Sequence, residues 1–578
     1  MTNRDIAAVF ERVADLLEFQ GANPFRVRAY RNGARKLADL AEPLASLAED
    51  PQRSFTDIEG IGKDLAEKIE TLLSTGTLPL LEELQAEVPP SVLALSLVPG
   101  VGPKKAARLH AELGIQTLAE LRAACEQQRV RALKGFGAKT EEAILKGLSV
   151  AEQAGQRMRW DEAEAIVEPL AEFLRGAARQ IEAAGSYRRG RETVGDLDLL
   201  ADADDVDAVM DRLASYPDVA DVIARGDAKM SVRLASGVQV DLRVAPSEAF
   251  GAALQYFTGS KEHNVIMRGK AKSRGLKVNE WGVFRVDDED SDEPGERIAG
   301  RTEAEVYAAL DLPLFPPEMR EARDEFTWAA AGALPQLVEL TDIRGDLHMH
   351  TTASDGHATL DEMIEAARSR GLEYIAITDH SQRVSMARGL DPDRLRRQWR
   401  EIDEVRRRYE DIQVLKGIEC DILERGGLDL PDDVLAEADW VIASVHYGQN
   451  QPRQQITDRI LEALANPHVH VIAHPTGRLI GRRDPYEVDL DAVMSAAAQE
   501  GKLLELNANP MRLDLDDVHC TAAQRRGVPI VISTDAHSIA GLDVMRHGVR
   551  QARRAGLTAA DVINTRPWAQ FRKFLGKA

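Results

Sequence analysis

The sequence predicts a multidomain protein with a helical N-terminal part, an α+β middle part and a C-terminal distorted (β/α)7 barrel. Its 578 residues exceed what one hydrophobic core can organise, so roughly three to five domains are expected. Residues 1–150 have the apolar spacing of helices joined by short turns, short strands begin near residue 160, and seven strand–helix units follow residue 341. These changes place the predicted domains at 1–90, 91–150, 151–248, 249–320 and 341–578, with a linker at 321–340.

The composition is typical of a globular protein that does not enter a membrane. Hydrophobic residues make up 44% of the chain and charged residues 29%, and no run of about 18 uncharged apolar residues offers a membrane span. Three distant cysteines exclude a disulfide framework, and a cytoplasmic setting is expected. The net charge of −22 does not exclude nucleic acid as a partner, because Arg26–Lys36 contains five basic residues and no acid.

Three turns in the N-terminal part share the pattern apolar-x-Gly-apolar-Gly, followed by lysine at or near the start of a helix. The glycines permit a tight turn whose backbone amides can approach a phosphate, and the lysine adds positive charge. This is the helix-hairpin-helix pattern, which contacts a DNA backbone without reading bases. One such turn also joins ordinary helices, but three close together favour DNA binding. The predicted DNA-binding residues are Gly60, Gly62, Lys63, Gly100, Gly102, Lys104, Gly135 and Gly137.

A set of carboxylates marks the middle part, where the strand pattern predicts an antiparallel sheet. Asp196 and Asp198 lie two residues apart on one predicted strand, and Asp241 lies on a neighbouring one. Close carboxylates repel one another unless divalent cations join them, and three suit two Mg²⁺ or Mn²⁺ ions for in-line displacement at phosphorus. Polar alternation alone gives Asp-x-Asp, but a preceding Gly-Ser-x-x-Arg-Gly is a nucleotidyltransferase signature. The residues expected beside a triphosphate are Gly185, Ser186, Arg189 and Gly195.

About residues 1–320 resemble the family X DNA polymerases. The resemblance rests on NPFRVRAYRNGARKL, the helix-hairpin-helix turns, Gly-Ser-Tyr-Arg-Arg-Gly, Gly-Asp-Leu-Asp, the third aspartate and Tyr-Phe-Thr-Gly-Ser. It implies a nucleotidyltransferase palm at 151–248, a thumb at 249–320, and gapped or primer–template DNA and dNTPs as partners. It also implies that the three aspartates are the catalytic metal ligands. Further contacts with the incoming nucleotide or the new base pair are implied for Tyr256, Phe257, Gly259, Asn264 and Arg268.

Lys68 matches the family's Schiff-base lysine, which removes 5′-deoxyribose phosphate. An amine nucleophile needs a lowered pKa, and Asp64 stands where the resemblance implies a supporting lysine. A nearby acid raises the pKa of an amine. Lyase activity and a purely solvated helix lysine therefore both stay open for this position.

Histidines concentrate in the C-terminal part, which holds eleven of the 13. Many of them, with acidic residues, follow predicted strands, whose C-terminal ends meet at one rim of a β/α barrel. Imidazole and carboxylate ligands suit Zn²⁺, Mn²⁺ or Fe²⁺. Nine candidate ligands are too many for one ion and suit a cluster of two or three. They are His348, His350, Asp355, His380, Glu419, His446, His474, Asp535 and His537.

This C-terminal part resembles the polymerase-and-histidinol-phosphatase (PHP) domain. The resemblance rests on His-x-His-x-x-x-x-Asp-Gly and Thr-Asp-Ala-His and implies that the nine positions bind metal, with Glu419 as a bridge and Asp379 as a partner of the ligands. His263 is expected either to face DNA or to pack inside its domain. The histidines expected to be structural are His357, His468, His470, His519 and His547.

Together the two resemblances imply a monomeric repair polymerase that fills short gaps, with a barrel that trims DNA as a 3′→5′ exonuclease. Cleavage at abasic sites stays open. One alternative is a metal-dependent DNA phosphoesterase whose polymerase half only binds DNA. Another is a polymerase whose barrel is structural. The completeness of both ligand sets favours the bifunctional enzyme.

Overall fold

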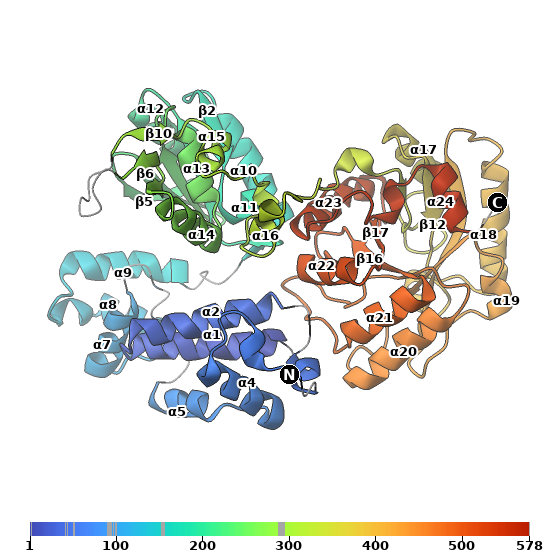
Figure 1. Cartoon of the computed structure of the whole chain (residues 1–578), viewed down its shortest axis with the longest axis horizontal. Helices are drawn as coiled ribbons and strands as arrows, with labels where there is room; N and C mark the ends of the chain where they lie inside the picture. Colours follow the sequence, from blue (N-terminus) through green and yellow to red (C-terminus); the bar gives the residue numbers. More distant parts are fainter. Residues whose placement is uncertain are drawn as a thin grey trace. The chain divides into compact units, whose positions relative to one another are not determined.

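The computed structural model describes the chain except for residues 2, 41, 43, 50–51, 89–94, 96–97, 99–100, 152–156, 287–294 and 577–578. The chain forms two compact units, Met1–Gln156 and Arg157–Ala578 (Figure 1). Within the described residues, no helix combines the length and apolar character needed to cross a bilayer.

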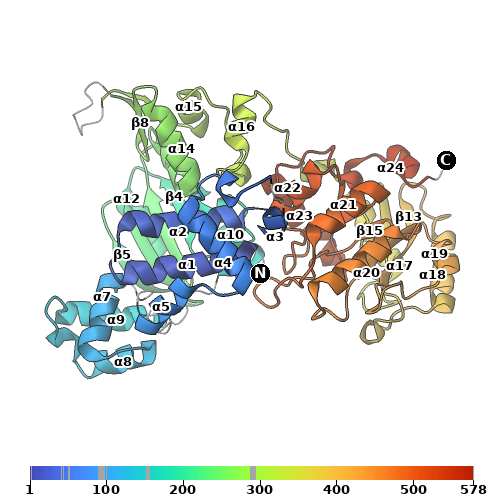
Figure 2. The ribbon, with the colours of Figure 1, turned by 60° about the horizontal axis from the view of Figure 1, so that its bottom comes forward.

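The first unit is helical, as the sequence predicts. α1 and α2 lie side by side (Figure 2), and the rings of Phe10 and Tyr30 meet edge to face with centroids 5.5 Å apart. The side chain of Asn23 accepts a hydrogen bond from the amide of Phe25, and Pro24 is the first residue of α2, so the helix begins with a cap. The helices are α1 (Asn3–Phe19), α2 (Pro24–Ala38), α3 (Leu44–Glu49), α4 (Lys63–Thr75), α5 (Pro79–Glu87), α7 (Pro103–Leu113), α8 (Leu118–Glu126) and α9 (Ala138–Ala151).

The second unit begins with a five-stranded sheet in the order β2-β4-β7-β6-β5. The predicted antiparallel sheet is wrong in one respect, because β4 and β7 run parallel, whereas the other neighbouring strands are antiparallel. α10 (Trp160–Leu174) and α12 (Val206–Ala214) share a hydrophobic core with the strands. The strands are β2 (Gln180–Ala183), β4 (Leu197–Asp202), β5 (Val219–Arg225), β6 (Lys229–Leu234) and β7 (Gln239–Val244).

A helix pair and a small antiparallel sheet follow. α13 (Phe250–Thr258) and α14 (Lys261–Lys272) pack with strands β8 (Leu276–Asn279), β9 (Gly282–Arg285) and β10 (Arg297–Ala299), and then come α15 (Glu303–Ala308) and α16 (Glu325–Ala330). His263 packs inside this part. Its ring lies 3.0 Å from a Glu325 oxygen and 2.9 Å from the Tyr307 hydroxyl, and it is fully buried.

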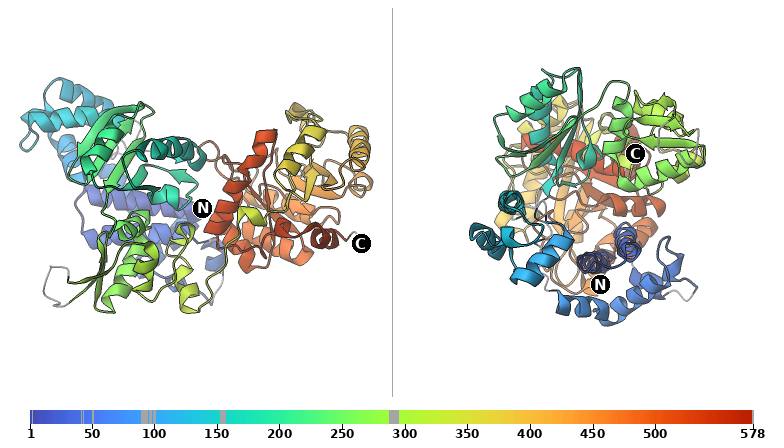
Figure 3. Two further views of the ribbon diagram at one scale, coloured as in Figure 1. Left: turned by 90° about the horizontal axis from the view of Figure 1, so that it is seen from above. Right: turned by 90° about the vertical axis from the view of Figure 1, so that its left-hand side faces the viewer.

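The C-terminal part is a seven-stranded, all-parallel barrel, which confirms the predicted fold. Its strands follow chain order from β11 to β17. A parallel bridge between Met349 and Ala536, with the amide of His350 donating to the Ala536 carbonyl at 2.8 Å, joins the first strand's end to the last. Helices lie outside the strands (Figures 2 and 3). The strands are β11 (Gly345–Asp346), β12 (Tyr374–Ile377), β13 (Gln413–Asp421), β14 (Trp440–Ser444), β15 (Val471–Ile472), β16 (Leu503–Asn507) and β17 (Ile530–Ser533).

Long helices cover the barrel and connect its strands. The main ones are α17 (Leu360–Ser369), α18 (Pro392–Val405), α20 (Arg453–Ala465), α21 (Leu490–Glu500), α22 (Asp517–Arg525), α23 (Met545–Arg554) and α24 (Trp568–Phe574). Ion pairs join the barrel to the preceding part of the same unit. They include Arg478 with Glu192, Arg546 with Glu164, Arg553 with Glu318 and Arg525 with Asp324.

Candidate metal centres and nucleic-acid interface

The carboxylates of the middle part lie on adjacent strands. Asp198 on β4 is in register with Asp241 on β7, and Asp196 immediately precedes β4. The hydroxyl of Ser231 and the amide of Gln239 donate hydrogen bonds to Asp241 and hold it in place. Burial raises the pKa of Asp198 to about 7, with further contributions from the negative charges of Asp196 and Asp241. This mutual repulsion is what a divalent cation would relieve.

The loop that precedes these carboxylates begins at Gly185, where no side chain would fit. Gly185 has φ +60°, and a Cβ at this position would lie 2.2 Å from Asp198 Oδ2. α11 (Gly185–Arg188) begins there and contains Ser186, while Gly195 is exposed beside Asp196. Arg189 also lies near the carboxylates, since its charge lowers the pKa of Asp198 against the effect of burial. The loop and the carboxylates predicted from the sequence therefore occur together.

Residues predicted to face the nucleotide lie at the end of α13 and on α14. Phe257 is half-buried under the Arg243 guanidinium, 4.1 Å from the ring centroid, and its ring meets that of Tyr256 edge to face. A Cβ on Gly259 would lie 3.2 Å from Arg189 Nη1.

On α14, Arg268 is exposed, whereas Asn264 is buried. The amide of Asn264 donates to the Tyr256 carbonyl at 2.8 Å and accepts from Gln255 at 2.7 Å. Both the nitrogen and the oxygen of this side-chain amide therefore already have hydrogen-bond partners inside the protein. The contact of Asn264 with DNA stays a prediction.

The nine predicted ligands of the barrel gather at the C-terminal ends of its strands. The ligand atoms of eight of them form three overlapping groups, and within each group all lie within 4.8 Å of one another. The ninth, His474, is in none of these groups and lies 3.1 Å from Glu419. Among the described residues, all such groups lie in the barrel. The three aspartates of the palm do not bring their oxygens this close together. The groups are His350, Asp355, His380 and His537; His348, His350 and Asp535; and His380, Glu419 and His446.

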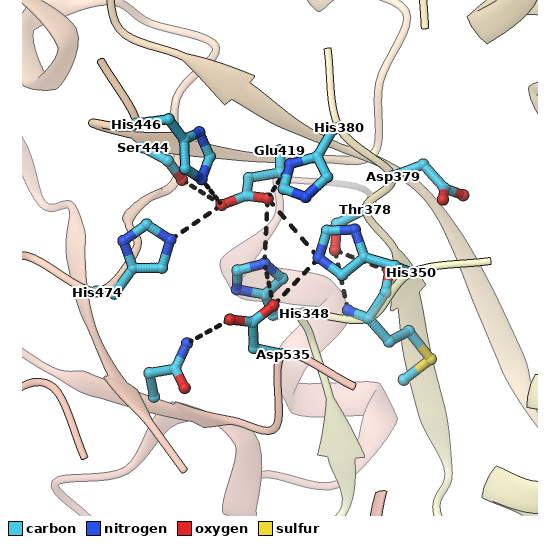
Figure 4. Close-up of polar contacts among 12 residues, drawn as sticks. His348, His350, Thr378, Asp379, His380, Glu419, Ser444, His446, His474 and Asp535 are labelled. Carbon is cyan, nitrogen blue, oxygen red and sulfur yellow. Dashed lines mark hydrogen bonds and ion pairs between the residues drawn. The ribbon is translucent and has the colours of Figure 1, made fainter. Parts of the chain in front are cut away.

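Glu419 occupies the centre of this cluster (Figure 4). Its Oε1 lies 3.1 Å from His474 Nε2 and 3.3 Å from His446 Nε2. Its Oε2 faces the other histidines, at 2.7 Å from His380 Nδ1 and 3.6 Å from His348 Nε2. Imidazoles thus lie beside both oxygens of this carboxylate, and its role as a bridge between ions, which the resemblance implies, stays a prediction.

Several buried ligand atoms have no hydrogen-bond partner in the described part of the chain. They include His348 Nε2 and His350 Nδ1. Buried polar atoms without partners are costly, and cations would satisfy these. Burial, with the charges of His537 and His380, lowers the pKa of His350 to about 4, so its neutral ring keeps a lone pair for a metal. The donor set fits a cluster of transition-metal ions.

Other carboxylates orient the ligands. Asp379 points away from the cluster (Figure 4) and accepts hydrogen bonds from the backbone and hydroxyl of Thr351 and from Ser354, so its predicted role as a partner of the ligands stays a prediction. Sequence reasoning missed Glu505, 2.7 Å from His348 Nδ1, and Asp421, 3.0 Å from His446 Nδ1. The sequence could have identified Glu505, because it lies on β16, a barrel strand to which none of the nine predicted ligands belongs.

The helix-hairpin-helix turns have one geometry. In each, the buried apolar residue between the glycines donates its amide to the carbonyl three residues before, namely Ile61 to Ile58, Val101 to Val98 and Phe136 to Leu133, at 2.8 to 3.0 Å. Gly60 and Gly135 have φ of +88° and +86°. Gly62, Gly102 and Gly137 precede the next helix and are exposed, as is Lys63. Gly100 lies outside the described residues, as does the side chain of Lys104.

Lys68 contacts Asp64, the residue that stands where the resemblance implies a supporting lysine. Its ammonium donates to Asp64 Oδ1 at 2.5 Å and lies 6.0 Å from the centroid of the Tyr30 ring. Burial would lower the pKa of Lys68, but the hydrogen bond to Asp64 and the neighbouring charges outweigh it and raise the pKa. A protonated amine is a poor nucleophile.

Comparison with known proteins gives matches along the chain. Family models match for a helix-hairpin-helix domain at 1–78, a SAM-like helix-hairpin-helix tandem at 92–149, the DNA polymerase beta thumb at 253–321 and the PHP domain at 346–509. The DNA polymerase/3′-5′ exonuclease PolX of Bacillus subtilis is 43% identical over 579 residues, covering 100% of this chain and 99% of that protein. A probable phosphatase of Thermoanaerobacter sp. is 31% identical over 234 residues, which is 38% of this chain and 89% of that protein.

We expect His350→Ala to reduce the metal content of the barrel, because His350 belongs to two of the three ligand groups. Metal analysis after dialysis against Mn²⁺ or Zn²⁺ is expected to find about two or three ions in the barrel of the parent protein and at least one fewer in the variant. His357→Ala is the control, since that side chain is exposed and belongs to none of the three groups. Equal metal content in all three proteins would contradict the assignment.

We expect Lys68 to form little Schiff base at neutral pH, because its hydrogen bond to Asp64 favours the ammonium. Asp64→Asn lowers the pKa of Lys68 and is expected to increase borohydride trapping on 5′-deoxyribose phosphate DNA by a factor of about 2 to 10. Lys68→Ala in the Asp64→Asn background reports trapping at other amines. No increase on Asp64→Asn would show that this hydrogen bond does not limit the reaction.

Proposed function

Since this chain belongs to the family X DNA polymerases that carry a C-terminal PHP domain, we propose that it fills short gaps in DNA and trims 3′ ends in the same polypeptide. The palm would add dNTPs to a primer, and the barrel would act as a 3′→5′ exonuclease. The observation that carries this proposal is the presence of two separate ligand sets, one of carboxylates and one rich in imidazole. Trimming before extension suits the repair of blocked 3′ ends.

In the palm, the three aspartates would hold two Mg²⁺ or Mn²⁺ ions, and the barrel residues would hold two or three ions of Zn²⁺, Mn²⁺ or Fe²⁺. Bound cations supply charge neutralisation on phosphate oxygens and a lower pKa for the attacking hydroxyl or water. The protein's own groups place the ligands: Ser231 and Gln239 fix Asp241, and Gly185 leaves room for Asp198. Ser186 and Arg189 are proposed to bind the triphosphate.

In the barrel, Glu505 and Asp421 orient His348 and His446 through the ring nitrogen that each ligand does not offer to the cluster centre. Arg512 Nε lies 3.5 Å from Asp535 Oδ2 and places a positive charge beside the cluster, where a phosphodiester would carry negative charge. The helix-hairpin-helix turns, with exposed glycines and Lys63, would contact the backbone of the flanking DNA.

Asp241→Asn is expected to lower dNTP incorporation on a one-nucleotide gap by at least about a hundredfold, because an amide cannot replace the charge that binds cations. Degradation of single-stranded DNA from its 3′ end is expected to continue. Primer extension and 3′ degradation are measured on one preparation, in Mg²⁺ and in Mn²⁺. Loss of both activities would contradict separate sites and would favour a single hydrolytic centre.

Asp535→Asn is expected to give the opposite result. It removes a carboxylate that lies 3.2 Å from His350 Nε2 and 3.4 Å from His348 Nε2, and so weakens the cluster. The 3′ degradation of a labelled primer is expected to fall at least about a hundredfold while gap filling by the variant continues. His519→Ala is a matched control, because His519 pairs with Asp516 outside the cluster. If Asp535→Asn still degraded 3′ ends as the parent does, the assignment of the exonuclease to the barrel would be wrong.

A further inference from the structure

One helix of the barrel packs directly on the palm loop that begins at Gly185. Arg550 of α23 places its guanidinium 3.1 Å from the centroid of the Trp160 ring, and Trp160 stacks on Tyr187 of the loop at 4.8 Å. Gly190, with φ +66°, leaves no room for a side chain, because a Cβ there would lie 2.5 Å from Arg550 Cδ. The figures place α23 at the edge of the barrel that adjoins α11 and α16 (Figure 1).

A buried network of charges runs from the same helix to Arg189. Arg554 Nη1 donates to Glu321 Oε1 at 3.0 Å and to the Arg189 carbonyl at 2.7 Å. Arg189 Nε donates to the same Glu321 oxygen at 3.1 Å, and its Nη1 donates to the Thr258 carbonyl. Arg554 Nη2 reaches Asp517 Oδ2 at 2.8 Å. One guanidinium of the barrel thus contacts both the backbone of Arg189 and the carboxylate that orients its side chain.

The network is largely shielded from water, so its contacts are strong. The side chain of Arg554 is 2% exposed and that of Glu321 is 10% exposed. Burial would raise the pKa of Glu321, but Arg554, Arg189 and other arginines lower it to about 2, so Glu321 stays charged. A planar guanidinium that bonds to three acceptors fixes their geometry, and lysine cannot reproduce all of these bonds. Loss of one member leaves buried charges without their partner.

We propose that Arg554 of the barrel is a positioning residue for the polymerase site. Through Glu321 and the Arg189 carbonyl, it holds the Arg189 guanidinium and the Gly185–Arg191 loop where the triphosphate of the incoming nucleotide binds. This inference rests on the proposed function, which assigns the triphosphate to this loop. It makes the barrel a structural part of the polymerase site in addition to its own chemistry.

The test compares Arg554→Met with Arg554→Lys and with the control Arg525→Met. Arg525 pairs with Asp324 across the same domain contact, but its side chain is 61% exposed. Gap filling by the full-length protein gives KM for dNTP and kcat. Arg554→Met is expected to raise KM about tenfold, equivalent to about 1.4 kcal/mol, with 3′ degradation within about twofold of the parent. Arg554→Lys recovers part of the loss, and Arg525→Met matches the parent.

Direct binding separates this inference from the function on which it rests. Titration of dNTP into the protein with gapped DNA that ends in a dideoxynucleotide gives an affinity without chemistry. If the parent does not bind dNTP, both the proposed function and the inference fail. If the parent binds and Arg554→Met binds equally well, the inference alone fails.

An equal loss of both activities, together with a lowered unfolding temperature, would show that Arg554 only joins the domains and would also overturn the proposal. Glu321→Gln reaches the same network from the thumb side and is expected to raise KM for dNTP in the same way. It keeps the test decisive if Arg554→Met does not fold.

Discussion

Negative charge held close together inside the protein is the constraint on which both candidate centres depend. In the palm, Asp198 is half-buried beside two other aspartates, and its pKa is raised to about 7. In the barrel, the Glu419 carboxylate is almost completely buried and faces five histidines. Such arrangements lower the stability of a protein unless cations or arginines compensate the charge. Their presence in two places therefore indicates selection for chemistry instead of stability.

The two centres meet this constraint differently. The palm places its carboxylates on or beside neighbouring strands and leaves Asp196 exposed just before β4, so solvent can reach this carboxylate. The barrel surrounds its carboxylates with imidazoles and places Glu505 and Asp421 behind two of these imidazoles. An open site suits ions that arrive with a nucleotide, and an enclosed one suits ions that stay bound.

Much of the fold and of the candidate sites can be predicted from the sequence, because short stretches of neighbouring residues determine them. The seven barrel strands are short apolar runs, and their ligands stand directly after them or near their ends, so position along the chain predicts position at the rim. The parallel pairing of β4 and β7 is not a local property, since a period of two is the same in parallel and antiparallel strands. The contacts of Asn264 with Gln255, and of Arg554 with Glu321, depend on tertiary packing and left no sequence signal. Whether the boundaries at 90, 248 and 340 separate independent domains stays a prediction.

The candidate ligands of the barrel come together only after its last strand has been synthesised, because the bridge that closes the barrel joins its first strand to its last. His350 stands near the start of the barrel and His537 near the end of the chain, yet both belong to one ligand group, and the strands that carry them meet at Met349 and Ala536. Domains at the N-terminus fold first as the ribosome elongates a chain. A nascent or truncated chain would therefore carry a finished helical unit long before it holds the complete set of candidate metal ligands in the barrel.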